Sequence, residues 1–193
     1  ACVTLFQAGI VKNNQRIFWN SGCAAMGYDL PAAIGASLAA NKEVILITGD
    51  GSLQMNLHEL QTNKQYNLPV KRFLLDNKGY NSIMQTQINC CNGEFIGCTL
   101  DSGVTCPDYR KLADLYDLDY MKIQNVDEID TIIDNALKSK KNVFCDVMLP
   151  TDYTFMPKLS SERKEDGTMI SQPLENLYPF LSKEELEENI IKI

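Results

Sequence analysis

Short apolar runs rich in β-branched residues alternate with helical segments along the first 150 residues of the chain. Four runs have the composition of buried parallel strands, at residues 44–47, 70–75, 120–123 and 143–148. The segments around them carry helical spacing or helix-start signals, which predict helices at residues 30–40, 52–66, 107–116 and 126–137. This alternation predicts an α/β fold, with a doubly wound, mainly parallel sheet and helices on both faces.

The pattern changes after Pro150. Residues 151–193 contain prolines, a charged run at 162–166 and one helix candidate from Ser182 onward. A group of residues there is too apolar for a solvated linker: Leu174, Leu177, Tyr178, Phe180 and Leu181. We therefore predict one domain over residues 1–150 and an extended C-terminal tail, residues 151–193, with a short helix. The tail is expected to wrap its own domain or a neighbour, and a disordered terminus is the alternative.

Bulk composition argues against several classes of function. The net charge of −7 disfavours nucleic acid, whose phosphates would be repelled. No apolar stretch approaches the roughly 20 residues that span a bilayer, and the first residues lack the basic region of a signal peptide. The seven cysteines include no C-x-x-C pair and His58 is the one histidine, which favours reduced thiols over a zinc or iron–sulfur site. We predict a cytoplasmic protein without a membrane partner.

The junction between the first strand and the following helix carries the strongest chemical signal. Residues 48–52 read Thr-Gly-Asp-Gly-Ser, so glycines flank Asp50 and permit a tight turn with close backbone approach to a ligand. A helix N-terminus offers N–H groups to a phosphate. The next strand ends at Asp76 and Asn77, and ligands of such sheets bind at the carboxyl ends of the strands. Asp50 and Asn77 are oxygen donors of the type that Mg²⁺ prefers beside phosphate, whereas Gly-Asp-Gly taken alone is more often a plain turn.

These residues resemble a known motif. Gly-Asp-Gly-Ser at 49–52, followed after 24 residues by Asn77, resembles the thiamine-diphosphate motif of the acetolactate synthase and pyruvate decarboxylase superfamily. Residues 20–35 are similar to the segment of that family at the central ring of the cofactor. Residues 55–60, 67–70 and 79–83 also fit, so the resemblance covers residues 16–150.

The resemblance implies thiamine diphosphate and Mg²⁺ as cofactors and assigns a role to each matching residue. Asp50, Asn77 and the backbone carbonyl of Gly79 would bind Mg²⁺. Met26 would bend the cofactor so that its pyrimidine amino group meets the thiazolium carbon, and the carbonyl of Ala24 would accept a hydrogen bond from that amino group. Gly51 and Ser52 would hold the diphosphate. The other residues that the resemblance implies for cofactor binding are Gly49, Tyr80 and Asn81.

The sequence departs from the family pattern at several positions. Asp76 stands where the family usually has Asn, and we expect it to cap the turn or tighten the metal site. Ala24 and Asp29 replace frequent glycines, and Asp29 would place a charge near the pocket mouth. Ala1 and Cys2 occupy the place of a His and a Gln beside the diphosphate.

Members of this family activate the cofactor with a Glu on a separate pyrimidine-binding domain, usually across a dimer interface. No stretch of this chain resembles that domain, and neither Glu59 nor Glu94 lies in the required context. We therefore predict no catalytic residue here and interpret the chain as part of a larger enzyme, inactive by itself, in a homodimer or tetramer. The predicted enzyme is an acetolactate-synthase-like carboligase or decarboxylase, a transferase or lyase, that acts on a small 2-oxo acid.

Two other functions stay open. The chain could be the stand-alone subunit of a heteromeric phosphonopyruvate or sulfopyruvate decarboxylase, because its length fits, although residues 166–169 and 173–180 are more similar to acetolactate-synthase-like proteins. It could also be a cofactor-binding or assembly module without catalysis. An iron–sulfur 2-oxo acid oxidoreductase subunit does not fit the cysteine spacing.

Overall fold

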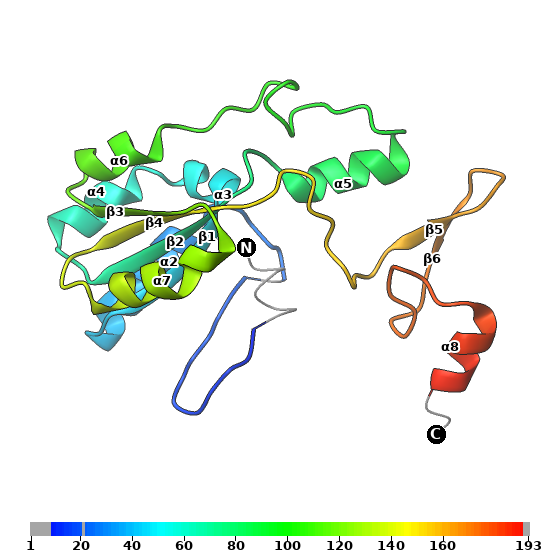
Figure 1. Ribbon diagram of the computed structural model, residues 1–193, viewed down its shortest axis with the longest axis horizontal. Coiled ribbons are helices and arrows are strands. Elements are labelled where there is room, and N and C mark those ends of the chain that lie inside the picture. Colours follow the sequence, from blue (N-terminus) through cyan, green and yellow to red (C-terminus); the bar gives the residue numbers. More distant parts are fainter. Residues whose placement is uncertain (1–8, 21, 191–193) are drawn as a thin grey trace.

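A computed structural model describes residues 9–20 and 22–190 of the chain, and its centre is a parallel sheet (Figure 1). The strands of this sheet are β1 (Val44–Gly49), β2 (Val70–Asp76), β3 (Asp119–Ile123) and β4 (Val143–Met148). Their order is β1-β2-β4-β3, and every neighbouring pair is parallel. The four predicted strands are thus confirmed, with ends that differ by one or two residues from the expected ranges.

Helices cover both faces of the sheet, as predicted, because successive strand side chains point to opposite faces. Leu74 and Phe144 belong to one core cluster and Phe73 and Cys145 to the other. The first cluster is completed by residues of α2 (Asp29–Ala40), α3 (Asp50–Met55), α4 (Glu59–Gln65) and α6 (Tyr109–Leu115). The second is completed by α7 (Ile129–Lys138), which follows the short 3-10 helix η1 (Val126–Glu128). The chain therefore has a doubly wound α/β core.

Two helices differ from the sequence-based expectation. The helix expected over residues 52–66 is divided into α3 and α4, because Asn56 leaves the helical conformation at φ −135° and its side-chain amide donates to the carbonyl of Gly27 at 2.7 Å. The helix expected from Pro107 begins instead at Tyr109. Asp108 is its N-cap and accepts hydrogen bonds from the two backbone N–H groups of Arg110 and Lys111.

One helix was not predicted. Helix α5 (Asn81–Cys90) directly follows the loop at the end of β2, and its buried positions are the polar residues Asn81 and Gln85. A helix that buries amides instead of an apolar stripe gives no hydrophobic periodicity, which is the main signal from which helices are predicted.

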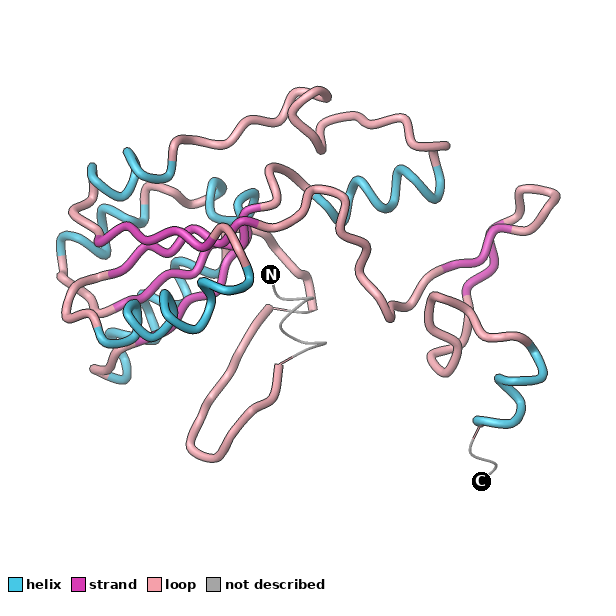
Figure 2. Tube along the Cα trace, in the orientation of Figure 1, coloured by secondary structure: helices cyan, strands magenta, loops and turns pink. Residues whose placement is uncertain are grey.

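The C-terminal tail is extended and lies beyond α5, away from the sheet (Figures 1 and 2). It contains an antiparallel hairpin that was not predicted, β5 (Ser161–Arg163) with β6 (Met169–Ser171), and the expected short helix α8 (Lys183–Asn189). The amides of Asn81 and Gln85 both donate to the carbonyl of Tyr153, at 2.7 and 2.8 Å, and so attach the tail to α5. No helix in the described ranges is long and apolar enough to cross a membrane.

Candidate functional site

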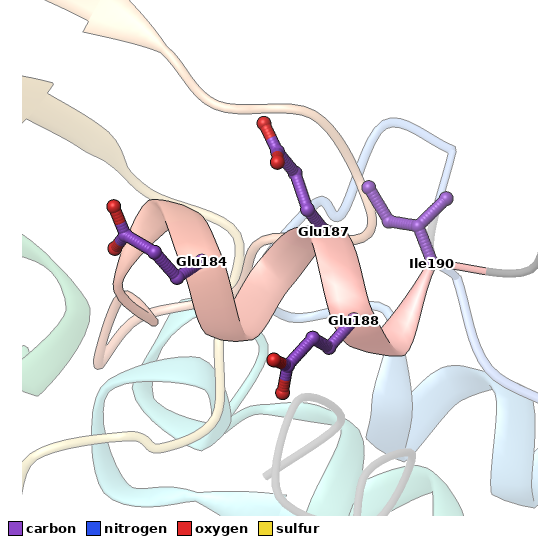
Figure 3. Close-up of a pocket in the computed structure, with 4 residues that line it drawn as sticks. All are labelled: Glu184, Glu187, Glu188 and Ile190. Atoms are coloured by element: carbon purple, nitrogen blue, oxygen red, sulfur yellow. The ribbon is translucent and has the colours of Figure 1, made fainter.

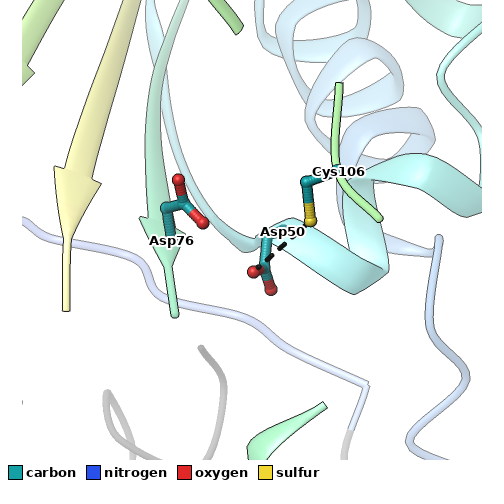
Figure 4. Close-up of side chains that lie close together, drawn as sticks. All are labelled: Asp50, Asp76 and Cys106. Atoms are coloured by element: carbon teal, nitrogen blue, oxygen red, sulfur yellow. Dashed lines mark hydrogen bonds between the residues drawn. The ribbon is translucent and has the colours of Figure 1, made fainter. Parts of the chain in front are cut away.

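The carboxyl ends of β1 and β2 bring the predicted metal ligands together. Gly49 of β1 lies opposite Leu75 of β2, so the next residues, Asp50 at the start of α3 and Asp76 at the end of β2, lie at the same edge of the sheet. Both carboxylates are buried, with 2% and 0% of their surface exposed. Figure 4 shows their side chains close together, Asp76 at the tip of its strand and Asp50 at the start of the helix. Two buried carboxylates at one edge are energetically unfavourable unless a positive charge lies close to them.

Asp50 organises the loop that follows β2. Its Oδ1 accepts a hydrogen bond from the Gly51 N–H at 2.8 Å, and its Oδ2 accepts one from the Gly79 N–H at 3.0 Å. One terminal atom of the Asn77 amide lies 3.0 Å from Oδ1 of Asp50 and 3.1 Å from the carbonyl oxygen of Gly79. The structure therefore brings the three predicted magnesium ligands into mutual contact.

The spacing of these three groups fits an octahedral cation. Mg²⁺ binds oxygen at about 2.0–2.1 Å, so two adjacent ligands of an octahedron lie about 2.9 Å apart. The Asn77 atom that faces Asp50 and Gly79 at 3.0 and 3.1 Å meets this spacing. If the Asn77 atom that faces Asp50 and Gly79 is the amide nitrogen, it donates to both of their oxygens. If it is the amide oxygen, three oxygen atoms face one another. The Asn77 side chain can thus turn either its N–H group or its oxygen toward these two groups.

The electrostatics of Asp50 also favour a bound cation. Burial raises the pKa of its carboxyl to about 6, although the hydrogen bonds from Gly79 and Gly51 lower it, and the neighbouring Asp76 raises it further. An ionised carboxylate is therefore costly here until a positive charge approaches. A divalent cation removes that cost.

Position 79 has no room for a side chain and therefore requires glycine. A Cβ atom at this position would lie 2.3 Å from the carbonyl oxygen of Cys98, which also accepts the Tyr80 N–H at 2.9 Å. Residues around Cys98 thus close over the loop and hold the Gly79 carbonyl beside Asn77. Only glycine allows this approach.

The predicted phosphate-binding residues lie in the first turn of α3. The ring of Tyr80 covers Gly51 so closely that a Cβ there would lie 2.2 Å from the ring atom Cε1. The hydroxyl of Ser52 accepts the Gly27 N–H at 2.9 Å. Tyr80 and the turn at Gly27 therefore meet at the start of α3, although they come from different parts of the sequence.

Met26 and Ala24 lie in the turn that contacts α3. The carbonyl and N–H of the adjacent Gly27 are held by Asn56 and Ser52, so the turn has a fixed place beside the loop of Asp50. Met26 is 48% exposed, and Ala24 has a left-handed φ of 49° that suits the glycine found at this position in the family.

Two further residues have structural partners. Asp29 accepts the Leu30 N–H at 2.8 Å and a hydrogen bond from the Thr48 hydroxyl, so it ties α2 to the end of β1 instead of presenting a free charge. Asn81, expected among the cofactor-binding residues, is 6% exposed and uses its amide N–H on the Tyr153 carbonyl. Ala1 and Cys2 lie outside the described residues.

The structure also adds residues that were not predicted. Asp76 caps the loop, as expected, by accepting the backbone N–H of Lys78 at 3.2 Å, and the Lys78 ammonium pairs with its other oxygen. Cys106 reaches the same place from the segment before α6, with its Sγ 3.8 Å from Oδ2 of Asp50 (Figure 4). No local sequence signal links Cys106 to a motif 56 residues earlier.

A hollow of about 600 Å³ lies elsewhere, against α8. It is lined by Glu184, Glu187, Glu188 and Ile190, and Figure 3 shows the three glutamates extending from the helix surface. These side chains belong to a helix of the tail that lies apart from the sheet (Figure 1). The buried carboxylates lie instead at Asp50 and Asp76, and the candidate site is therefore placed there.

The fold and the site together define a doubly wound α/β domain with two buried carboxylates and the start of a helix at the carboxyl edge of its sheet, the edge at which such sheets bind ligands. The description "Thiamine pyrophosphate enzyme, C-terminal TPP binding domain" matches residues 1–147. The chain therefore belongs to this family of thiamine-diphosphate-binding domains, as the resemblance predicted.

The comparisons with individual proteins agree with this family. The chain is 34% identical to an acetolactate synthase of Arthrospira platensis over 152 residues, which are 78% of this chain and 26% of that protein. It is 39% identical over 142 residues to the acetolactate synthase large subunit of Buchnera aphidicola subsp. Schizaphis graminum, covering 71% of this chain and 24% of that one. The chain thus spans about a quarter of the length of these relatives.

A solved structure shows the same fold. It is the thiamine-diphosphate-dependent 4-hydroxybenzoylformate decarboxylase of Rhodococcus jostii RHA1, with a TM-score of 0.57 and 26% identity. The match covers 68% of this chain and 24% of that chain. The predicted fold class and the predicted acetolactate-synthase-like family are both confirmed.

Proposed function

We propose that Asp50, Asn77 and the carbonyl of Gly79 hold a Mg²⁺ ion that anchors the diphosphate of thiamine diphosphate. The observation that carries this proposal is the contact of the Asn77 amide with Asp50 and Gly79 at 3.0 and 3.1 Å. This spacing suits adjacent ligands of Mg²⁺, and the family supplies the diphosphate that completes its coordination.

The other residues of the site bind and orient. Gly49, Gly51 and Ser52 at the start of α3 would donate hydrogen bonds to the diphosphate oxygens, mainly from backbone N–H groups, and Tyr80 closes over Gly51. The turn of Ala24 and Met26 is fastened to α3 through Gly27, so Met26 can support the middle of the cofactor. Bound thiamine diphosphate supplies the electron sink that decarboxylation of a 2-oxo acid requires.

We further propose that the complete enzyme is an acetolactate-synthase-like carboligase or decarboxylase of a small 2-oxo acid, either a transferase or a lyase. The identity to acetolactate synthases supports this class. Because the buried carboxylates of this chain lie at the diphosphate end, the Glu that activates the cofactor is expected on a pyrimidine-binding domain that pairs with this one in a homodimer or tetramer.

Calorimetry of thiamine diphosphate binding to the assembled enzyme, with and without Mg²⁺, tests the metal ligands. Asn77→Ala removes one proposed ligand and should weaken Mg²⁺-dependent binding by about tenfold to a hundredfold. Asn189→Ala, on the exposed α8, is the matched control and should bind as the unmodified enzyme does. Equal affinity in the two variants would refute the assignment.

A further inference from the structure

A second set of potential metal-ligand atoms lies beside the loop that follows β2. Among the described residues, Asp50, Asp76 and Cys106 each offer one ligand atom within 4.8 Å of the others. Figure 4 shows the three side chains turned toward one another, with the Cys106 thiol directed at Asp50. The Asn77 amide contacts Oδ1 of Asp50, whereas the thiol faces Oδ2, the oxygen that also accepts the Gly79 N–H.

An unpartnered hydroxyl faces the same cluster. Tyr109 is 3% exposed, and its hydroxyl has no hydrogen-bond partner of acceptable geometry among the described residues. Burial raises the pKa of this hydroxyl, and the adjacent Cys106 and the carboxylates of Asp50 and Asp76 raise it further. The hydroxyl lies next to the thiol of Cys106, one of the three groups. A buried polar group without a partner is unfavourable, and a water bound to a cation in the cluster would satisfy it.

We propose that Asp50, Asp76 and Cys106 form a site for a thiophilic divalent cation, such as Zn²⁺ or Co²⁺, that competes with Mg²⁺. Two carboxylates and a thiolate are a ligand set for a cation of intermediate softness, whereas Mg²⁺ selects oxygen. The distance of 3.8 Å between Cys106 Sγ and Asp50 Oδ2 is close to the separation of about 3.5 Å expected for two ligands of tetrahedral zinc.

The Lys78 ammonium already supplies this cluster with one positive charge, which a metal ion can displace. The Lys78 ammonium pairs with Asp76, but 46% of the Lys78 side chain is exposed, so it can turn into solvent when a cation enters. Binding releases the thiol proton of Cys106 to water and exchanges one Lys78 charge for two on the metal. The three ligands then carry three negative charges.

Competition with Mg²⁺ follows from the shared Asp50. Its Oδ2 is held by the Gly79 N–H at 3.0 Å and is also the oxygen nearest to Cys106. A cation bound to the thiol draws this carboxylate away from Gly79 and Asn77 and so loosens the magnesium ligands. Only this competition rests on the proposed function, because the thiol-containing site itself is independent of thiamine diphosphate.

Titration of the reduced full chain with Co²⁺ alone tests the site directly. Thiolate bound to Co²⁺ gives a charge-transfer band in the near ultraviolet, and carboxylates do not. The band should form in the unmodified chain and in Cys91→Ala, which removes an exposed cysteine, and should be absent in Cys106→Ala. Asp76→Asn keeps the size of its side chain and should weaken Co²⁺ binding by about tenfold or more. No band in the unmodified chain, or an unchanged band in Cys106→Ala with native circular dichroism, would overturn the proposal.

A competition experiment separates this proposal from the proposed function. At fixed free Mg²⁺, added Zn²⁺ should weaken thiamine diphosphate binding to the assembled enzyme, and Cys106→Ala should need about tenfold more Zn²⁺ for the same loss. If Zn²⁺ inhibits both proteins equally, the competition through Cys106 is wrong while Mg²⁺-dependent binding stands. If Mg²⁺ supports no binding at all, the proposed function fails, and the Co²⁺ band alone decides the thiol site.

Discussion

Asn77 contacts Asp50 across the carboxyl edge of the sheet, with one amide atom 3.0 Å from Oδ1 of the carboxylate. The two residues belong to different strand ends, and the parallel register of β1 and β2 brings them together. The same amide atom touches the Gly79 carbonyl at 3.1 Å. The side chain of Asn77 therefore connects the other two proposed magnesium ligands, Asp50 and the Gly79 carbonyl.

Asp50→Ala should abolish Mg²⁺-dependent binding of thiamine diphosphate, because it removes the charged ligand and the acceptor of two backbone N–H groups. Calorimetry on the assembled enzyme measures the loss, which we expect to exceed about a hundredfold. Asp76→Asn is the control: it keeps the size of the side chain and removes a carboxylate outside the proposed magnesium ligands, so Mg²⁺-dependent binding should persist. Retained metal-dependent affinity in Asp50→Ala would rule out this ligand.

Stabilisation by Mg²⁺ should depend on pH. The pKa of Asp50 rises from 3.8 to about 6 in the folded chain, so the fold holds this proton more tightly than the unfolded chain does. The Asp50 contribution to stability is thus largest below pH 3.8 and is lost as the pH rises through about 6. Mg²⁺ needs the ionised carboxylate, so its affinity should rise roughly tenfold per pH unit below the pKa of Asp50. With thiamine diphosphate present, the increase in melting temperature that Mg²⁺ causes should therefore become larger between about pH 5 and 7. A shift that is constant over this range would contradict the prediction.

Ala24→Gly should stabilise the turn beside α3. Ala24 has φ 49°, a left-handed conformation that costs an alanine about 1 kcal/mol and a glycine almost nothing. Chemical denaturation should show a gain of up to about 1 kcal/mol, reduced by the greater freedom of glycine in the unfolded chain. Ala25→Gly, one residue later and without a left-handed φ, is the control and should give no gain. Loss of stability in Ala24→Gly would show that the methyl group is needed for packing.

Gly51→Ala should disrupt the start of α3, because the new Cβ would lie 2.2 Å from the ring of Tyr80. Either the ring or the turn must move, and we expect thiamine diphosphate binding to weaken by at least about tenfold. Gly35→Ala is a matched control in α2, where nothing lies within 4 Å of the added atom. This control should gain about 0.5–1 kcal/mol of stability from helix propensity and bind normally. Similar binding by the two variants would contradict the role of this close contact.

The chain by itself should not decarboxylate pyruvate at an enzymatic rate. Asp50 and Asp76 are buried at the end of the sheet where we propose that the diphosphate binds, and a second domain is expected to enclose the pyrimidine ring. An assay of the purified chain with thiamine diphosphate and Mg²⁺ should give a turnover well below roughly 1 s⁻¹. Turnover at or above this rate would place the activating carboxylate within this sequence.

Met26→Ala should reduce turnover of the complete enzyme more than it reduces cofactor affinity. Met26 is half exposed on a turn that Ser52 and Asn56 fasten to α3, so its proposed task is to hold a reactive cofactor conformation. Steady-state rates and cofactor titrations measure the two effects separately. Equal losses in both quantities would mean that Met26 contributes only packing.

The sequence by itself predicted the strands, the parallel sheet and the placement of Asp50 and Asn77 at its carboxyl edge. Strand signals are local: β-branched runs bury their side chains in any parallel sheet, and Asp50 and Asn77 lie directly at the ends of two such runs. Glycines around Asp50 mark a turn for the same local reason. These features needed only composition, spacing and the rule that ligands bind at carboxyl ends of strands.

Tertiary structure decided the features that depend on distant neighbours. Helix α5 buries the amides of Asn81 and Gln85 against the tail, so it lacks the apolar stripe that predicts a helix. Asn56 interrupts a predicted helix because its partner is the carbonyl of Gly27, 29 residues earlier. Cys106 reaches Asp50 only because α6 packs on a face of the sheet and the segment before it passes the end of β1. A hydrogen bond or ligand contact between remote segments has no periodicity in the sequence, and only packing establishes it.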